Sequence, residues 1–349
     1  MQKLRIFALS ALAVWIIQVV FFAPQTVAEG EEKAKAAEAK IDAAAPEKPK
    51  LPQVTENSPQ AKQLLDSARD KLFAHDTIQA NIVERISFGD RRFEATGSYI
   101  AHQPPNKIPL TRLRYTIRVG DTTGELLEVC DGLVLRSMKT ISRVESAAKK
   151  SEKEAAATKA DASTKSSGKS KSTKPKEDIL LTRRDISQII KSIGNSESSE
   201  AIQVADLGLG GIPSILASLN RTFWFVEVTD DKWKGKPVKS LEGYLNIERI
   251  RGVFKAGLAS KAKELEPLVP ERARLQLDAE TLFPVRIIYL RQLDAAGTKF
   301  ITQMTMEFTD VILDRPLEST EIFTLNAPPG VNERDETTEY ENYLKAPTR

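Results

Sequence analysis

The chain has 349 residues, and 51 Lys and Arg against 48 Asp and Glu leave a formal net charge of +3. Proteins that neutralise many phosphates usually carry a larger basic excess, so this balance argues against a nucleic-acid partner. The single cysteine, Cys130, excludes an intrachain disulfide and any zinc or iron–sulfur site built on cysteines. With only His75 and His102 as histidines, the sequence predicts no metal site, no catalytic centre and no cofactor.

The first 28 residues have the pattern of a secretory signal peptide. Lys3 and Arg5 precede a long uncharged apolar stretch, and Thr26-Val27-Ala28 offers a small residue at the cleavage position. Glu29 follows, so the chain lacks the cysteine that a bacterial lipoprotein acylates there. We therefore expect a periplasmic or otherwise exported protein. The alternative is a protein anchored by an uncleaved N-terminal helix.

Two further segments contain too few large apolar residues to form a packed core. Residues 29–57 are rich in Ala, Glu, Lys and Pro and are predicted to be a disordered linker. Residues 145–177 hold 9 Lys and 5 acidic residues, and we expect them to be a disordered insertion. Their basic excess suits either an anionic partner or a solvated surface loop. The folded domain is then 58–332 without the insertion, followed by a charged tail, 333–349.

The first half of the domain reads as one helix and several strands. Ser58-Pro59 is a helix start, and apolar residues follow at helical spacing as far as Leu72. Alternating apolar residues then predict three strands: Ile78–Phe88, with Glu84 intruding on its apolar face, Phe93–Ala101 and Leu113–Val119. Asp131-Gly132 predicts a hairpin that joins strands at Leu126–Cys130 and Leu133–Ile141.

After the insertion, Asp185 is placed to cap a short helix that runs from Ile186 to Ile193. Gly208–Gly211 precedes a second helix around Pro213–Leu219. Five more strands are expected, at Phe223–Val228, Leu241–Ile250, Arg274–Asp278, Val285–Gln292 and Lys299–Val311. The whole predicts an α+β domain with a strongly curled antiparallel sheet, a half-barrel of about nine to eleven strands. Its helices would cover an apolar cavity.

Four local stretches occur in a suggestive order. They are Gly97-Ser98-Tyr99 leading into Pro104-Pro105-Asn106, then Val129-Cys130-Asp131-Gly132-Leu133, the apolar helix Ile212–Leu219, and Ile322-Phe323-Thr324-Leu325 followed by Pro328-Pro329-Gly330-Val331. Together they resemble the periplasmic outer-membrane lipoprotein carrier family (LolA-like fold), of which this chain looks like a divergent member. The family's arginine before the proline turn is absent, because His102-Gln103 stands there.

The resemblance implies a soluble exported carrier that binds acyl chains of a lipid or lipoprotein in a hydrophobic cavity and performs no chemistry. Its partner would be a lipid or a lipidated protein. An envelope protein partner and a peripheral contact with the membrane are further possibilities. A monomer is expected. The alternative is an envelope sensor or protein-interaction module that uses the same fold without lipid transfer.

On this view the cavity is lined by side chains from three strands, a helical lid and an aromatic rim. The candidates are Leu113, Tyr115, Ile117, Val119, Ile215, Leu216, Leu219, Trp224, Tyr289, Met304, Met306 and Phe308. Gly208–Gly211 would be the hinge of the lid. The alternative for each residue is ordinary packed core. One strand face carries Arg112, Arg114 and Arg118, which could contact lipid head groups or simply be solvated. Cys130 is either a reactive thiol or a small buried hydrophobe.

Overall fold

The computed structural model describes residues 54–88, 91–104, 107–143, 176–193, 199–209, 211–246, 269–293 and 299–345. The predicted signal peptide, the linker as far as residue 53 and the insertion as far as residue 175 lie outside these residues. Within them the fold is α+β, as predicted, with one mostly antiparallel sheet and several helices. No single described helix is long and apolar enough to cross a membrane, although the bent pair Glu200–Asp206 and Gly211–Thr222 together passes a test of length and composition.

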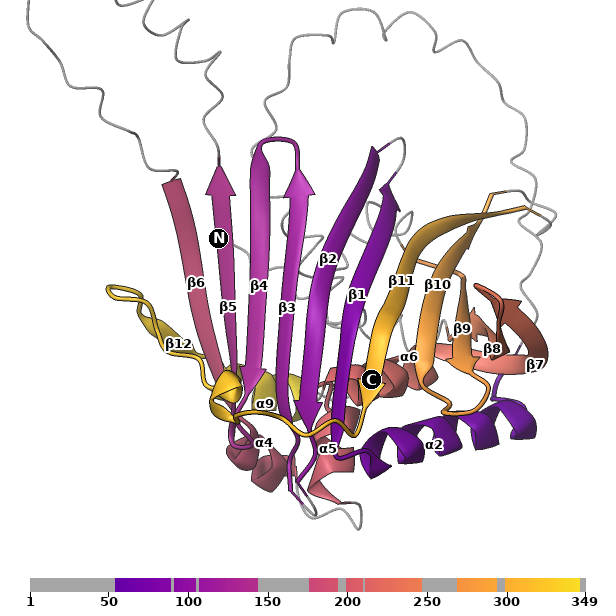
Figure 1. The fold of residues 1–349 in the computed structure, drawn as a ribbon, viewed down its shortest axis with the longest axis horizontal. Coiled ribbons are helices and arrows are strands. Elements are labelled where there is room, and N and C mark those ends of the chain that lie inside the picture. Colours follow the sequence, from indigo (N-terminus) through magenta and orange to yellow (C-terminus); the bar gives the residue numbers. More distant parts are fainter. Residues whose placement is uncertain are drawn as a thin grey trace, which may run out of the picture.

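The sheet of the described chain has twelve strands. They are β1 (Thr77–Phe88), β2 (Arg91–His102), β3 (Leu110–Val119), β4 (Thr122–Cys130), β5 (Val134–Arg143), β6 (Lys176–Asp185), β7 (Phe223–Trp233), β8 (Lys236–Leu245), β9 (Arg272–Asp278), β10 (Pro284–Gln292), β11 (Phe300–Leu313) and β12 (Glu333–Asp335). Their spatial order is β12-β6-β5-β4-β3-β2-β1-β11-β10-β9-β8-β7 (Figure 1). Among the strands that the structure describes, only β12 and β6 form a parallel pair.

The strongly curled half-barrel was a wrong prediction. The sheet is open, and its edge strands β12 and β7 lie at opposite ends of the molecule (Figure 1). The apolar side chains do not converge on a single core that would draw the edges together. They form separate clusters, each covered by its own helices or chain segments. The ordinary twist between neighbouring strands is then sufficient.

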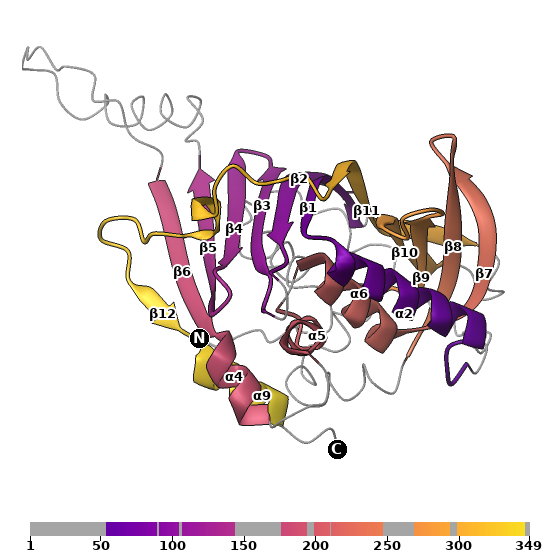
Figure 2. The ribbon, with the colours of Figure 1, turned by 60° about the horizontal axis from the view of Figure 1, so that its bottom comes forward.

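Five helices pack around this sheet in the described residues: α2 (Pro59–Ala74), α4 (Ile186–Ile193), α5 (Glu200–Asp206), α6 (Gly211–Thr222) and α9 (Thr337–Lys345). The predicted caps are confirmed, because the side chain of Ser58 accepts a hydrogen bond from the Ala61 N–H and Asp185 accepts one from the Gln188 N–H. Helices α2 and α6 lie side by side against the same face of the sheet (Figure 2). We call this the inner face.

Three elements differ from the sequence predictions. Strand β6 was not predicted, because its apolar residues follow the Lys-rich segment directly, and its first two residues were assigned to that insertion. Strand β8 begins at Lys236, earlier than expected, because Lys234 and Gly235 both adopt positive φ angles, 50° and 79°, and close a tight hairpin. Helix α5 was also missed, since it has only seven residues.

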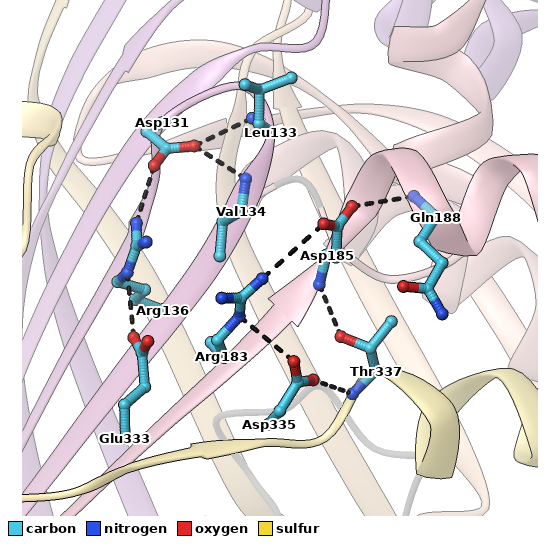
Figure 3. Close-up of polar contacts among 10 residues, drawn as sticks. All are labelled: Asp131, Leu133, Val134, Arg136, Arg183, Asp185, Gln188, Glu333, Asp335 and Thr337. Atoms are coloured by element: carbon cyan, nitrogen blue, oxygen red, sulfur yellow. Dashed lines mark hydrogen bonds and ion pairs between the residues drawn. The ribbon is translucent and has the colours of Figure 1, made fainter.

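Residues 333–345, which the sequence assigned to a charged tail, form a strand and a helix that pack on the domain. Strand β12 pairs with β6, and Arg136 on β5 bonds both Glu333 and Asp131 (Figure 3). The Asp131 carboxylate also accepts hydrogen bonds from the N–H groups of Leu133 and Val134. Burial opposes ionisation of Asp131, but these N–H groups and the guanidinium still hold its pKa below the usual value.

The start of α9 is fixed in the same way. The Thr337 hydroxyl accepts a hydrogen bond from the Asp185 N–H at 2.9 Å, and Arg183 pairs with Asp335 at 3.4 Å (Figure 3). Hydrogen bonds from the side chain and N–H of Thr337 lower the pKa of Asp335. The folded domain therefore includes β12 and α9.

The core is divided between the two faces of the sheet. The largest cluster joins the inner face of β1–β3 and β7–β11 to α2 and α6. A second lies between β4, β5, α4, α5 and α9, and includes Cys130 and Tyr340. The third lies on the opposite, outer face, where Phe323 and Leu325 of the segment after β11 cover Val129 and Leu181.

Candidate functional site

The structure gathers the predicted lining residues into one place. All of them except Trp224 belong to the largest cluster on the inner face. Tyr115 and Ile117 are 0% exposed, and Met306 and Phe308 are 1% exposed. Leu113, Val119 and Ile215 are only partly buried at its margin. Strand alternation thus placed these side chains on one face of the sheet, and those at the centre of the cluster are closely packed.

Trp224 does not belong to this set. It alternates along β7 with Phe223 and Phe225, which are buried in the cluster. Trp224 pairs with Tyr244, whose ring stacks on the guanidinium of Arg272 outside the cluster. The side chain of Trp224 thus lies on the outer face. The aromatic side chains that β7 contributes to the cluster are those of Phe223 and Phe225.

Cross-strand pairing places one continuous row of side chains in the middle of the inner face. From β3 to β8 the paired residues are Ile117, Ala95, Glu84, Met306, Ile287, Leu275 and Leu241. Each of them is at most 1% exposed. Glu84 is the only polar member, so a carboxyl group lies among hydrocarbon and thioether side chains.

Burial dominates the electrostatics of this carboxyl. It raises the pKa of Glu84 to about 8, and the nearby Tyr115 hydroxyl offsets only part of that effect. Burial also raises the pKa of Tyr289, and the charge of Glu84 adds to the increase. Glu84 is therefore mostly protonated at neutral pH. The Glu84 carboxyl therefore lies within electrostatic reach of Tyr289 on β10.

Tyr115 approaches the carboxyl from β3 across a glycine. Gly97 on β2 pairs directly with Tyr115, and a Cβ atom at position 97 would come within 2.9 Å of Cδ2 of the ring. The bare backbone of Gly97 makes room for the ring beside β1. The carboxyl oxygens of Glu84 and the hydroxyl of Tyr115 have no hydrogen-bond partner within the described structure other than each other. Two buried polar groups thus lie together with part of their hydrogen-bonding capacity unused.

The next row of the inner face is less completely covered. Here Phe93, Ile86, Met304 and Tyr289 lie side by side on β2, β1, β11 and β10. Phe93 and Ile86 are partly buried, and Met304 and Tyr289 are each 8% exposed. One row away from Glu84 the apolar layer is therefore less completely covered than in its central row.

Helix α6, the predicted lid, is fixed to the sheet at its first residue. Gly211 has a φ angle of 64°, and a Cβ atom there would collide with the Tyr99 ring. The Ile212 N–H bonds to the Tyr99 hydroxyl, whose pKa is raised mainly by burial. Gly211 thus permits a close approach of helix and sheet, which is a different requirement from the flexible hinge that the sequence suggested.

A pocket of about 420 Å³ lies between α2, α5 and α6. Leu65 and Leu216 form its apolar part, and both also belong to the inner-face cluster. Its polar lining comprises Asp66, Arg69, Asp206, Asn220 and Arg221. The pocket therefore lies directly over the apolar layer, at the contact between the two covering helices.

Two further candidates from the sequence, Arg112 and Cys130, have structural roles. Arg112 donates a hydrogen bond to the Ile322 carbonyl at 2.7 Å and so secures the outer-face segment. Cys130 is 1% exposed, and burial raises its pKa to about 12, which makes it a buried hydrophobe and not a reactive thiol. No group of three or more potential metal ligands occurs among the described residues.

Sequence reasoning missed two features of the inner face. Glu84 was visible as a break in the alternation of β1, but its proximity to Tyr115 depends on strand register. Part of the inner face of β4–β6 is polar, with Lys139 and Arg184 close to Glu128. Burial raises the pKa of Glu128, and the two cations oppose this increase. The apolar layer therefore has a charged border on its β4 side.

No family model and no curated protein matches the sequence. Among solved structures, LprF from Mycobacterium bovis is 10% identical, with a TM-score of 0.31 over 75% of this chain and 97% of that chain. MucB in complex with MucA(peri) is 12% identical, with a TM-score of 0.33 over 77% of this chain and 59% of that chain. This chain therefore matches less than two thirds of the MucB chain.

A third similar structure is a putative outer membrane lipoprotein-sorting protein domain from Vibrio parahaemolyticus. It is 10% identical, with a TM-score of 0.26 over 75% of this chain and 96% of that chain. At these identities and scores, the function has to be argued from the residues of the chain itself.

Proposed function

We propose that the protein is an exported carrier that binds the acyl chain of a lipid or lipidated protein on the inner face of its sheet and catalyses no reaction. The observation that carries this proposal is the extent of the apolar layer. Its central row from β3 to β8 contains no ionisable side chain except Glu84, and the layer is covered by the apolar sides of α2 and α6.

The energetic case rests on hydrocarbon burial. Removing a methylene group from water contributes about 0.8 kcal/mol, so a chain of about 16 carbons gains on the order of 10 kcal/mol. Met304 and Met306 lie centrally in the layer, and unbranched thioether side chains rearrange readily around guests of variable shape. The layer can therefore accept an acyl chain at moderate cost in packing.

Entry requires that the covering helices separate from the sheet. The pocket over Leu65 and Leu216 lies at the contact between α2 and α6. The partly exposed row with Ile86 and Phe93 offers apolar surface at the margin of the same layer. We propose that a guest chain enters between these points and opens the cavity as it displaces the methionine side chains.

The test is the lipid content of the protein after export in a bacterial host and gentle purification. Ile86→Asp places a carboxylate at the margin of the layer, whereas the control Ile312→Asp places one at an exposed position on the outer face of β11. We expect bound acyl lipid in the wild type and the control, and at least about a tenfold loss in Ile86→Asp, equivalent to about 1.4 kcal/mol. A wild-type protein without acyl lipid would contradict the proposal, as would equal retention by both variants.

A further inference from the structure

The central row of the inner face contains one residue that packing does not explain. Glu84 is 0% exposed and pairs across the sheet with Ala95 and Met306. Its carboxyl oxygens and the Tyr115 hydroxyl have no hydrogen-bond partner among the described residues other than each other. An unpaired buried polar group costs about 1–3 kcal/mol, so a leucine at position 84 would give a more stable fold. The carboxyl is therefore better explained by binding than by stability.

The neighbours of Glu84 are uncharged on every strand that faces it. Ile82 and Ile86 flank it on β1, and Phe93 and Gly97 lie beside it on β2. The inner residues of the other adjacent strands are Tyr115 and Ile117 on β3, Met304 and Phe308 on β11, and Ile287 and Tyr289 on β10. None of these can neutralise an anion. Apolar surroundings favour the neutral form of a carboxyl group, and the raised pKa of Glu84 agrees with this.

The donors and acceptors define which ligand group fits. A neutral carboxyl has one O–H donor, and the Tyr115 hydroxyl has another. A carbonyl oxygen has two lone pairs and can accept from both. A carboxylate could accept the same two bonds, but its charge would stay buried without a cation, which is costly. An uncharged ester carbonyl meets both conditions.

We propose that Glu84 and Tyr115 bind the carbonyl oxygen of an uncharged acyl ester, so that the ligand is a neutral acyl lipid and not a free fatty acid. This inference rests on the proposed function, since the acyl chain would occupy the surrounding apolar layer. Tyr289, on the far side of the carboxyl, is the third polar side chain within reach of the same group.

The test compares ligands of matched chain length on the full-length protein. Methyl palmitate, palmitate and hexadecylammonium each compete with the fluorescent probe 1-decylpyrene, which has no carbonyl group and reports on the apolar layer alone. For the wild type we expect methyl palmitate to bind at least about tenfold more tightly than either charged ligand. Glu84→Leu should lose about tenfold in affinity for methyl palmitate while it binds 1-decylpyrene as before. Tyr115→Phe should lose several-fold, and Glu84→Gln, which keeps a donor, should lose less than Glu84→Leu.

Thermal unfolding separates a binding role from a structural one. Glu84→Leu should melt at a higher temperature than the wild type, so weaker ester binding cannot result from unfolding. If Glu84→Leu binds methyl palmitate as well as the wild type does, or if a charged ligand binds more tightly to the wild type, this inference is wrong while the proposed function stands. If 1-decylpyrene and all three ligands fail to bind the wild type, both are wrong.

Discussion

At the scale of single residues, Glu84 makes the fold depend on pH. The ordinary pKa of a glutamate is about 4.5, and burial raises that of Glu84 to about 8. Between these values the folded protein holds a proton that the unfolded chain releases, so the free energy of unfolding falls as pH rises. Below this pH window the Glu84 carboxyl is neutral in both the folded and the unfolded state. Above it the carboxyl is ionised in both states, so Glu84 causes no further change in the free energy of unfolding.

The first prediction concerns this pH dependence. Between pH 4.5 and pH 8, Glu84 should lower the free energy of unfolding by on the order of 4 kcal/mol. Urea unfolding at a series of pH values measures the decline. Glu84→Gln should flatten it, whereas the control Glu318→Gln, at an exposed carboxyl, should leave it unchanged. A decline of equal size in Glu84→Gln would show that another group causes it.

Gly211 supplies the second prediction. Gly211→Ala combines an unfavourable φ of 64° with a collision against the Tyr99 ring. Gly235→Ala is the matched control, because Gly235 has a φ of 79° but no neighbour within 4 Å of the added Cβ. We expect the control to lose about 1 kcal/mol of unfolding free energy from backbone strain, and Gly211→Ala to lose about 2 kcal/mol or more. Equal losses in chemical unfolding would contradict the close packing of α6 on β2.

At the scale of elements, β12 and α9 complete the second cluster. Tyr340 of α9 is 8% exposed and packs in the same cluster as Cys130 and Leu135. Arg184 on β6 stacks on the Tyr340 ring and bonds Glu336 at 3.1 Å. These contacts bury the only cysteine of the chain.

The third prediction uses that cysteine as a reporter. A chain that ends at Asn332 should react with a thiol reagent at neutral pH at least about tenfold faster than the intact chain, because local opening becomes easier. A chain that ends at Lys345 is the control and should react as slowly as the intact protein. Equal rates for all three chains would mean that β12 and α9 do not protect the cluster.

The fourth prediction concerns residues 144–175, which connect β5 to β6. The last residue of β5, Arg143, pairs with the first residue of β6, Lys176, so the two strand ends are adjacent. An Asn-Gly turn in place of 144–175 should therefore leave the free energy of unfolding within about 1 kcal/mol of the wild type. Bound acyl lipid should also be unchanged. Loss of the lipid with an intact fold would assign this segment a role in binding.

At the scale of the whole molecule, much of the fold follows from local sequence patterns. The alternation in β1, β2 and β3 identified the strands and their inner face, and the helices α2 and α6 followed from their apolar spacing. What depends on distant pairing could not be predicted. The parallel pair β12–β6 joins residues far apart in sequence, and the approach of Tyr115 to Glu84 requires the register of three strands.

The site shows the same division. The apolar character of the lining residues was predictable, because each follows the period of its own element. How tightly the central lining residues pack was not predictable, since their burial depends on which helices cover the sheet. Glu84 broke the local pattern, and such conflicts between pattern and position tend to mark functional residues.

The central claim is that the inner face of the sheet holds the acyl chain of an ester. The most direct measurement is photo-crosslinking of the full-length protein with a palmitoyl ester that carries a diazirine on its alkyl chain, followed by peptide mapping. We expect adducts at Ile86 and Met304 on the inner face and at Leu216 on the covering helix α6, and excess methyl palmitate should suppress them. Adducts confined to exposed residues such as Leu133 and Ile312 would contradict it.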